Sequence, residues 1–389
     1  MLPDRPKTLA ATLRMLIGLG LRTYLLAMTP MTFFQRSLIY QPTRCASLIA
    51  SNSGTSYPLV DLTVQAHDGL ELHGWLSLTA SVPAAAAVDV PGSLATGGLV
   101  ILYFPGNAGN RAKRFRQFEV LTSLKAHVLL VDYRGYGDNA GKPSEQDFAR
   151  DARSIWNQLT TELGVPPHRV VIYGESLGGG VATRLASDLC REEIEPGGLI
   201  VQSTFSSLVA VAQAQFPLIP VSWLLVDRYP SDRRIVDVTC PILQIHGQQD
   251  TIVPLAIGQR LFDAAPATST QGIPKQQLVM PETDHNNVYG GQRDHEILIN
   301  GLSRFFAVIT EQFTAEQPTA EQPTDGAQPV PPDRAVIPRQ PADVGFHWPI
   351  DGTLLMTLVL VGLAEALWWL ARTKSRPGLS DHTNSRESG

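Results

Sequence analysis

Short apolar runs alternate with longer stretches of helical periodicity through the middle of the chain. The first two runs meet at Asp68-Gly69, a dipeptide typical of tight turns, and helical stretches separate the later ones. This alternation predicts an α/β domain: an eight-stranded, mostly parallel sheet with helices on both faces. Ser144 is expected to cap the second helix. The predicted strands are 59–65, 70–78, 99–104, 127–132, 170–173, 199–202, 242–246 and 277–280, and the predicted helices are 111–124, 145–163, 177–190, 254–264 and 295–308.

The C-terminal part of the chain has a different apolar pattern. Residues 352–371 form a run of 20 residues with one charge, Glu365, and as a helix they would be about 30 Å long, the thickness of a bilayer core. Trp348 and Trp368 lie near its two ends, where membrane interfaces favour aromatic rings. The pattern predicts a transmembrane helix over 350–371. The alternative, a buried globular helix, fits poorly with the polar stretches on either side.

An apolar segment near the N-terminus, 15–34, is a weaker candidate for a membrane span. Arg22 lies inside it and Pro30 interrupts it. Three interpretations stay open: a membrane anchor, a helix lying in the interface, or a cleaved signal peptide. Basic residues outside the two apolar segments favour cytoplasmic chain ends and a body outside the cytoplasm, although the competing count on the body side is not much smaller. Those at the ends are Arg5, Lys7, Arg14, Arg372, Lys374 and Arg376, and those on the body side are Arg36, Arg44, Arg334 and Arg339.

Two low-complexity stretches lie outside the predicted core. Residues 311–345 contain TAEQP twice in tandem and recurrent proline, a composition that cannot bury enough apolar surface to fold, so we expect a tether. The Ala- and Pro-rich stretch 79–97 interrupts the body and is expected to be a surface insertion. The chain therefore divides into 1–40 (hydrophobic segment), 41–310 (α/β domain), 311–349 (linker), 350–371 (transmembrane helix) and 372–389 (polar tail).

Composition excludes several classes of protein. The 389 residues are 43% hydrophobic, enough for a large core, and 17% charged, below the ~25% of average soluble domains. Cys45, Cys190 and Cys240 are too few and too widely spaced for a disulfide scaffold or a CxxC motif, and the histidines lack metal-ligand spacing. We therefore expect no metal and no other cofactor. A net charge of −5 gives no overall positive field, so a nucleic-acid partner is not expected.

The motif Gly174-Glu175-Ser176-Leu177-Gly178 is the strongest chemical signal in the sequence. It directly follows a predicted strand and directly precedes a predicted helix. A serine at such a turn adopts a strained backbone conformation, and the flanking glycines leave room for the neighbouring strand and helix. A phosphate-binding loop is the alternative, but the Gly-Lys-Ser/Thr ending of such loops is absent. Ser176 is therefore the predicted nucleophile.

A serine nucleophile needs a base beside it and a group that orients the base. His285 follows the last predicted strand, and Asp250 follows the strand before it, so both lie on loops at the edge of the sheet where Ser176 is expected. The chain order serine, aspartate, histidine is that of one known class of serine hydrolases. We predict His285 as the base and Asp250 as its partner.

Three other residues compete for these roles. Asp284 is adjacent to His285 and is expected to point away from it, and Asp132 lies at the end of an earlier strand. His246 also lies at a strand end, where a packing role is expected.

Acyl transfer also needs hydrogen-bond donors for the oxyanion that develops on the substrate. The loop 105–110, PGNAGN, follows a predicted strand, and its glycines let backbone N–H groups turn inward. We predict an oxyanion hole formed by the N–H groups of Leu177 and Asn107, with Ala108 as the alternative to Asn107.

These motifs resemble the α/β-hydrolase superfamily, especially the membrane-associated abhydrolase-domain serine hydrolases, which include esterases and protein-depalmitoylating thioesterases. The resemblance covers residues 34–308. It rests on YFPGNAGN (103–110), VDYRGYG (131–137), GKPSE (141–145), YGESLGGGVA (173–182) and IHGQQDTIVP (245–254).

The resemblance implies the α/β-hydrolase fold with a short cap, placed in 204–239. Within it, the apolar stretch 216–226 either lines an acyl pocket or packs under the cap. Relatives usually carry histidine where Pro105 stands, a residue that braces the oxyanion loop, so the geometry of this loop is in question. The basic cluster next to the loop is expected to be a solvated helix face, with an anionic head group or substrate as the alternative contact. The cluster is Arg111, Lys113, Arg114 and Arg116.

The resemblance also implies a two-step reaction in which Ser176 attacks an acyl carbonyl, His285 takes and returns the proton, and Asp250 orients the imidazole. The expected partners are a small-molecule or lipid-like acyl substrate and a membrane, with the oligomeric state open. A serine peptidase of the same fold and a catalytically silent, membrane-tethered binding protein are the competing interpretations.

Overall fold

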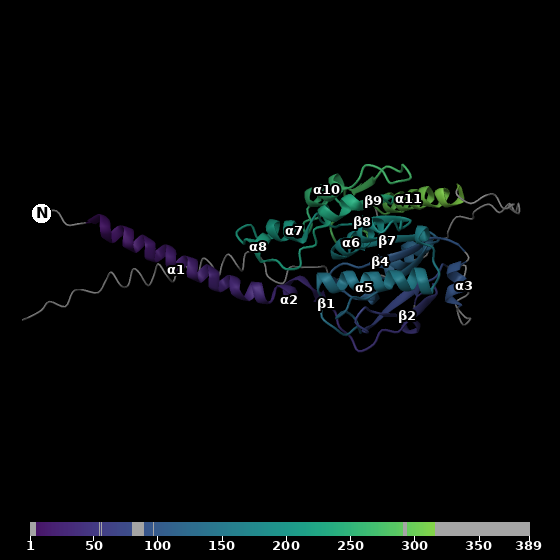
Figure 1. Cartoon of the computed structure of the whole chain (residues 1–389), viewed down its shortest axis with the longest axis horizontal. Helices are drawn as coiled ribbons and strands as arrows, with labels where there is room; N and C mark the ends of the chain where they lie inside the picture. Colours follow the sequence, from purple (N-terminus) through teal and green to yellow (C-terminus); the bar gives the residue numbers. More distant parts are fainter. Residues whose placement is uncertain are drawn as a thin grey trace, which may run out of the picture. The chain divides into compact units, whose positions relative to one another are not determined.

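A computed structural model of the chain describes residues 5–53, 55, 57–79, 89–95, 97–290 and 294–315 (Figure 1). The chain divides into two compact units, and the predicted site residues belong to the unit Ile39–His347. The other unit contains helix α1 (Arg5–Phe33) and most of helix α2 (Gln35–Ile39).

The larger unit is built on a sheet of eight strands in the order β10-β9-β8-β7-β4-β6-β3-β2. The pairs β2/β3 and β3/β6 are antiparallel, and the other pairs are parallel. The predicted eight-stranded, mostly parallel sheet is confirmed. The strands are β2 (Leu59–Gln65), β3 (Glu71–Ser77), β4 (Val100–Phe104), β6 (His127–Val131), β7 (Val170–Glu175), β8 (Gly198–Gln202), β9 (Ile242–Gly247) and β10 (Gln276–Met280).

Helices of the larger unit lie at the five predicted positions, and four further short helices among its described residues lie outside them. They are α3 (Val90–Ala95), α4 (Phe115–Ser123), α5 (Glu145–Asn157), α6 (Leu177–Arg191), α7 (Leu208–Gln215), α8 (Val221–Leu224), α9 (Ser231–Arg234), α10 (Leu255–Ala264) and α11 (His295–Ala315). Short 3₁₀ or π turns occur at η1 (Ala50–Asn52), η2 (Arg111–Lys113), η3 (Gln158–Glu162), η4 (Pro167–Arg169) and η5 (Ile235–Asp237).

Two predicted helices are less regular than expected. The segment 111–124 is divided into η2 and α4, because Arg114 has a φ of −117° and a ψ of 18° and leaves the helical conformation. The segment 145–163 is α5 followed by the π turn η3. The cap at Ser144 is confirmed, since its Oγ accepts a hydrogen bond from Asp147 N at 3.0 Å.

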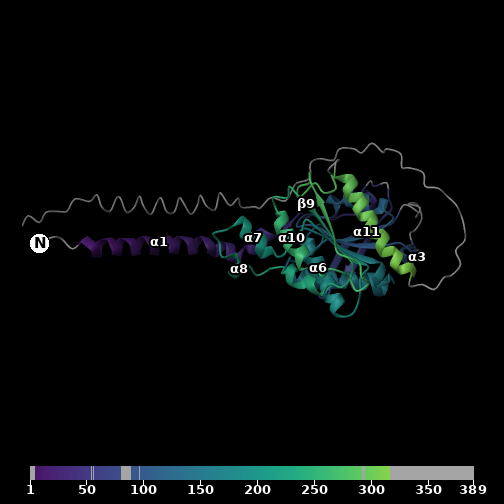
Figure 2. The same cartoon turned by 90° about the horizontal axis from the view of Figure 1, so that it is seen from above.

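Side-chain alternation along the strands divides the apolar residues between two faces of the sheet. On one face, Ile101 of β4 and Val171 of β7 belong to a buried cluster that α4 and α11 complete with Phe118 and Phe305. On the other face, α6 packs against β7 and β8, and α5 packs against α6. Figure 2 shows α6 and α11 on opposite sides of the sheet. The sheet is therefore buried from both sides, and polar residues collect on the loops at its carboxyl edge.

The segment between β8 and β9 contains α7, α8 and α9, at the position predicted for a cap. Its stretch 216–226 is part buried and part exposed: Phe216 and Ile219 are buried, whereas Trp223 is 88% exposed. A second, two-stranded ladder was not predicted. It pairs β1 (Gln41–Pro42) with β5 (Ala108–Gly109) in parallel.

No helix in the described ranges, α1 among them, is both long and apolar enough to cross a membrane. The predicted transmembrane helix 350–371 and tail 372–389 lie outside the described residues, as does most of the linker 311–349. The first five residues of that linker are helical, because α11 continues through them to Ala315.

Candidate active site

Ser176 lies in the sharp turn between β7 and α6. Its φ of 51° and ψ of −114° fall in a region that residues other than glycine rarely adopt. A Cβ at Gly178 would meet the carbonyl oxygen of Phe104, and a Cβ at Gly174 would meet the carbonyl oxygen of Gly178. Glycine at these two positions lets β4, β7 and α6 approach closely, as the spacing of the motif predicts.

Two hydrogen bonds to the end of β8 fix the backbone of this turn. Ser176 N donates to Gln202 O at 2.8 Å, and Thr204 Oγ1 donates to Ser176 O at 2.7 Å. The hydroxyl of Ser176 is thereby placed at the carboxyl edge of the sheet, at the start of α6.

His285 comes to the same edge from the loop that follows β10. Its Nε2 lies 3.0 Å from Ser176 Oγ, and its Nδ1 lies 2.7 Å from Asp250 Oδ2. The serine and the histidine are 109 residues apart in the sequence. In the structure the three predicted residues are therefore connected by hydrogen-bond contacts, from Ser176 through His285 to Asp250.

Asp250 lies on the loop after β9 and is held by its own turn. Its Oδ1 accepts hydrogen bonds from Ile252 N at 2.9 Å and from Val253 N at 2.7 Å, which leaves Oδ2 for His285. The Asp250 side chain is fully buried. Two backbone donors and the imidazole thus fix the orientation of the Asp250 side chain.

The loop 105–110 lies beside the turn at Ser176, because β4 pairs with β7 and Phe104 is the partner of Gly174. Within the described residues, the N–H groups of Asn107 and Leu177 donate no loop, turn or side-chain hydrogen bond. An oxyanion hole needs donors of this kind, aimed at the reacting carbonyl from the start of a helix and from the adjacent loop.

Comparison with known proteins identifies the family. An uncharacterized protein of Mycobacterium tuberculosis is 36% identical over 271 residues, which cover 70% of this chain and 86% of that protein. The family described as alpha/beta hydrolase fold matches residues 100–229. The chain belongs to the α/β-hydrolase superfamily.

Two further proteins are similar to this chain. Lysophosphatidylserine lipase ABHD12 of Danio rerio is 35% identical over 195 residues, 46% of this chain and 50% of that protein, so the chain spans half the length of this relative. An esterase of Pyrococcus furiosus has a TM-score of 0.50 with 17% identity, covering 69% of this chain and 98% of the esterase, and it shares the fold. The family match and the esterase structure agree on the α/β-hydrolase fold.

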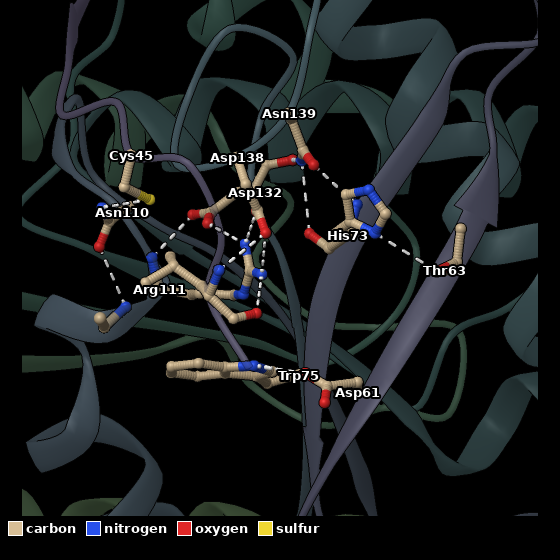
Figure 3. A network of polar contacts seen from close by, with 12 residues as sticks. Cys45, Asp61, Thr63, His73, Trp75, Asn110, Arg111, Asp132, Asp138 and Asn139 are labelled. Atoms are coloured by element: carbon tan, nitrogen blue, oxygen red, sulfur yellow. Dashed lines mark hydrogen bonds and ion pairs between the residues drawn. The ribbon is translucent and has the colours of Figure 1, made fainter. Parts of the chain in front are cut away.

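In this α/β-hydrolase the two competing acids have other partners. Asp284 accepts hydrogen bonds from Asn286 N and Asn287 N within its own exposed turn. Asp132 binds the guanidinium of Arg111, with Oδ2 at 2.7 Å from Nη1 (Figure 3). Burial raises the pKa of Asp132 to about 6, against the opposing effect of Arg111. Neither carboxylate contacts His285 in the structure.

His246 is buried behind the acid, in the packing position that the sequence predicts. Its Nε2 lies 2.8 Å from Val253 O and 3.5 Å from Asp250 Oδ2. Burial lowers the pKa of His246, although Val253 O and Asp250 oppose this effect. A neutral imidazole that donates from Nε2 to Val253 O fits this position.

Tyrosines from the loop after β6 brace the loop 105–110, in which the sequence predicts an oxyanion donor. Tyr133 OH donates to Pro105 O at 2.9 Å, and Tyr136 OH donates to Asn107 Oδ1 at 2.9 Å. Both tyrosines are buried. Sequence reasoning missed this role, although both residues lie in the motif VDYRGYG.

An ion pair supports the same loop from the other side. Arg114 Nη2 donates to Ala108 O at 3.0 Å, and Arg114 Nε lies 3.2 Å from Glu175 Oε2. Tyr103 OH donates to the same Glu175 oxygen at 2.6 Å. A Cβ at Gly106 would lie 3.0 Å from Glu175 Oε1, so the loop passes close to this carboxylate. The only sequence signal for Glu175 was its position beside the serine.

The prediction of a solvated basic face is wrong for two members of the cluster. Arg111 and Arg114 are buried, because carboxylates from neighbouring elements pair with them. Arg116 is part exposed and pairs with Glu119 at 3.2 Å. Among the described residues, His, Cys, Asp and Glu side chains form no group of three or more that could hold a metal ion.

Proposed function

We propose that this chain is a serine hydrolase that cleaves a carboxylic ester or thioester through an acyl-enzyme. The main support is the line of contacts from Ser176 Oγ to His285 and on to Asp250, with distances of 3.0 and 2.7 Å. An imidazole placed in this way accepts the serine proton, and the carboxylate stabilises the imidazolium that forms.

In the first step, Ser176 Oγ attacks the acyl carbon while its proton moves to His285 Nε2. The carbonyl oxygen becomes an oxyanion, which the N–H groups of Asn107 and Leu177 stabilise. The tetrahedral intermediate then expels the alcohol or thiol, which takes the proton from His285 and leaves the acyl group on the serine.

In the second step, water attacks the acyl-enzyme and gives a proton to His285. The second tetrahedral intermediate collapses, the proton returns to Ser176 Oγ, and the carboxylic acid leaves. The atoms and protons of these two reaction steps balance without a cofactor.

We propose a lipid-like acyl donor, for two reasons. The Danio rerio relative is named as a lysophosphatidylserine lipase. In addition, the predicted cap, which lies between β8 and β9 in the sequence, contains the apolar stretch 216–226.

We also propose that the protein is held at a membrane by 350–371, with the body outside the cytoplasm, on the strength of the sequence pattern. Fractionation of cells that express the full chain or a chain ending at Ala315 tests the anchor. We expect the shorter chain to be released. Release of the full chain as well would contradict the role of 350–371, and retention of both chains would indicate that residues 15–34 are an anchor in their own right.

A fluorophosphonate probe tests the catalytic serine. The wild type is expected to be labelled, and Ser176→Ala is expected to lose labelling and to lower kcat for p-nitrophenyl esters on the order of 10⁴- to 10⁶-fold. Ser187→Ala, a buried serine on α6, is the matched control and should keep both properties.

The competing functions give different outcomes. No labelling of the wild type, or equal labelling of Ser176→Ala, would favour the silent binding protein. Hydrolysis of aminoacyl amides in preference to esters of every chain length would favour the peptidase. A preference that rises with acyl chain length would support the lipid-like donor.

A further inference from the structure

The segment between helix α2 and the sheet runs along the candidate site. We call residues 39–48 the strap. It begins at Ile39, the last residue of α2, and it includes β1. No sequence motif predicts a role for this segment.

The first half of the strap is joined to the oxyanion loop. The Asn107 side chain donates to Ile39 O and accepts from Gln41 N at 3.3 Å. The ladder of β1 with β5 pairs Gln41 with Ala108, and Thr43 N donates to Gly109 O at 3.2 Å. The strap therefore adds a strand to the loop that carries the predicted oxyanion donor.

The second half of the strap is joined to the loop that follows β6. Gly137 N donates to Thr43 O at 3.0 Å, and Cys45 N donates to Gly137 O at 2.9 Å. Asn110 Nδ2 also donates to Thr43 O, at 3.1 Å. The strap thus lies between the oxyanion loop and the loop that supplies Tyr136, the third partner of the Asn107 side chain.

A buried charge cluster fixes the end of the strap. Arg111 Nη2 donates to Leu48 O at 2.8 Å, and Leu48 N donates to Asp138 Oδ2 at 2.9 Å. Figure 3 shows Arg111 between Asp132 and Asp138, with Asn110 and Cys45 beside them. Because Arg111 directly follows the oxyanion loop, the same cluster ties down the strap and the end of that loop.

The strap also reaches the cap. Tyr40 is buried, and its hydroxyl donates to Asp227 Oδ2 at 2.9 Å and lies 3.0 Å from Tyr229 OH. Both partners lie between β8 and β9. One short segment therefore contacts both the loop 105–110 and the segment predicted to form the cap.

We propose that the strap is a positioning element of the active site, which sets the direction of the Asn107 N–H and couples it to the cap. The inference rests on the proposed serine-hydrolase function. Its physical basis is that orientation is a large part of catalysis, since a displacement of about 1 Å can cost about 10²-fold in rate. Strap residues would not touch the substrate, so they act through Asn107.

Two variants of the full chain loosen the strap at different points. Asn110→Ser keeps the oxygen that caps η2 through Ala112 N and removes the Nδ2 donor to Thr43 O. Tyr40→Phe keeps the ring and removes the hydroxyl contact with the cap. Tyr57→Phe is the matched control. Tyr57 lies outside the strap, and the change likewise removes a hydroxyl donor, in this case to Phe115 O at 3.2 Å.

The readout is hydrolysis of a p-nitrophenyl ester and of the corresponding thionoester. Sulfur accepts hydrogen bonds weakly, so the ratio of ester to thionoester rates reports the oxyanion donors. In Asn110→Ser we expect kcat for the ester to fall about tenfold with KM nearly unchanged, and the ratio to fall by a similar factor. Tyr40→Phe should lower the ratio by about threefold, and Tyr57→Phe should leave it unchanged.

Three results would overturn the inference. If both strap variants keep the wild-type kcat and the wild-type ratio of ester to thionoester rates, a positioning role is excluded. If the rates for the ester and the thionoester fall equally, the role of the strap is purely structural. If Asn110→Ser does not fold, Tyr40→Phe decides between the same outcomes. A wild type that hydrolyses no ester would instead refute the proposed function, and this inference with it.

Discussion

The turn at Ser176 and the loop 105–110 end the neighbouring strands β7 and β4, but they are held in place by different means. The turn is fixed by glycines and by backbone bonds to the adjacent strand, such as Ser176 N to Gln202 O at 2.8 Å. The loop is fixed by side chains and strands from distant parts of the chain. Asn107 contacts Ile39, 68 residues away, and Tyr136, 29 residues away.

This difference separates two ways of building a catalytic site. A strained turn encoded within five residues forms wherever a strand meets a helix with the right glycines. A loop without local constraints takes its shape only when the rest of the domain has folded around it. The nucleophile is therefore expected to tolerate distant mutations better than the oxyanion loop.

The largest expected effect comes from Arg111, at the end of the oxyanion loop. Arg111→Met would leave Asp132 and Asp138 without their buried partner, and removal of one member of a buried ion pair costs about 3–5 kcal/mol. Urea denaturation should show this loss in the free energy of unfolding. A loss below about 1 kcal/mol, the size expected for a surface pair, would mean that the cluster does not hold the loop.

Arg184→Met is the control for this prediction. Arg184 pairs with Asp188 at 3.5 Å on the surface of α6, where both side chains are substantially exposed. The same change in size and charge there is expected to cost less than about 1 kcal/mol. The comparison of the two variants isolates the contribution of burial.

The next prediction concerns the turn itself. In Gly178→Ala, the new Cβ would meet the carbonyl oxygens of Phe104 and Pro105, so α6 has to move away from β4. Overpacking of this kind costs about 1–3 kcal/mol, and because the turn moves, kcat for ester hydrolysis should fall at least about tenfold. Gly290→Ala, whose nearest neighbour would be Asn287 O at 3.8 Å, should change neither quantity. Equal activity in the two variants would contradict a turn held by close packing.

The parts of the fold that the sequence predicts are those with a local physical cause. Continuous apolar runs such as 170–173 in β7 are buried from both sides of the sheet, and this is what a parallel strand requires. Polar residues directly after such runs lie at one edge because parallel strands end together. For this reason Asp250 and His285, after β9 and β10, could be placed beside Ser176 before any coordinates were known.

The parts that could not be predicted depend on contacts between distant residues. Arg111 and Arg114 look like a solvated helix face in the sequence, because the carboxylates that bury them come from other loops and from β7. The strap at 39–48 has only a two-residue ladder with β5, too short to leave a periodic pattern. The bracing of the loop 105–110 by Tyr133 and Tyr136 is likewise a property of the assembled loops.

The smallest expected effect concerns His246, which lies beside the carboxylate of Asp250. His246 is buried against Val253 O and Asp250, with His285 nearby, and burial lowers its pKa below the ordinary value of 6.5. The unfolded chain therefore takes up a proton at His246 as the pH falls below about 6.5, whereas the native protein does not. Because the unfolded state then binds more protons, the free energy of unfolding decreases with falling pH.

Between pH 6.5 and 5.5 one such proton can remove at most about 1.4 kcal/mol of stability. His246→Gln keeps a side-chain N–H for Val253 O and cannot be protonated in this range, so its unfolding free energy should fall less over the same interval. Urea denaturation of both proteins at the two pH values measures the difference, and the other titrating groups cancel in it. An equal decrease in the free energy of unfolding of both proteins would mean that His246 is charged in the native state. The carboxylate of Asp250 would then be shared between His246 and His285.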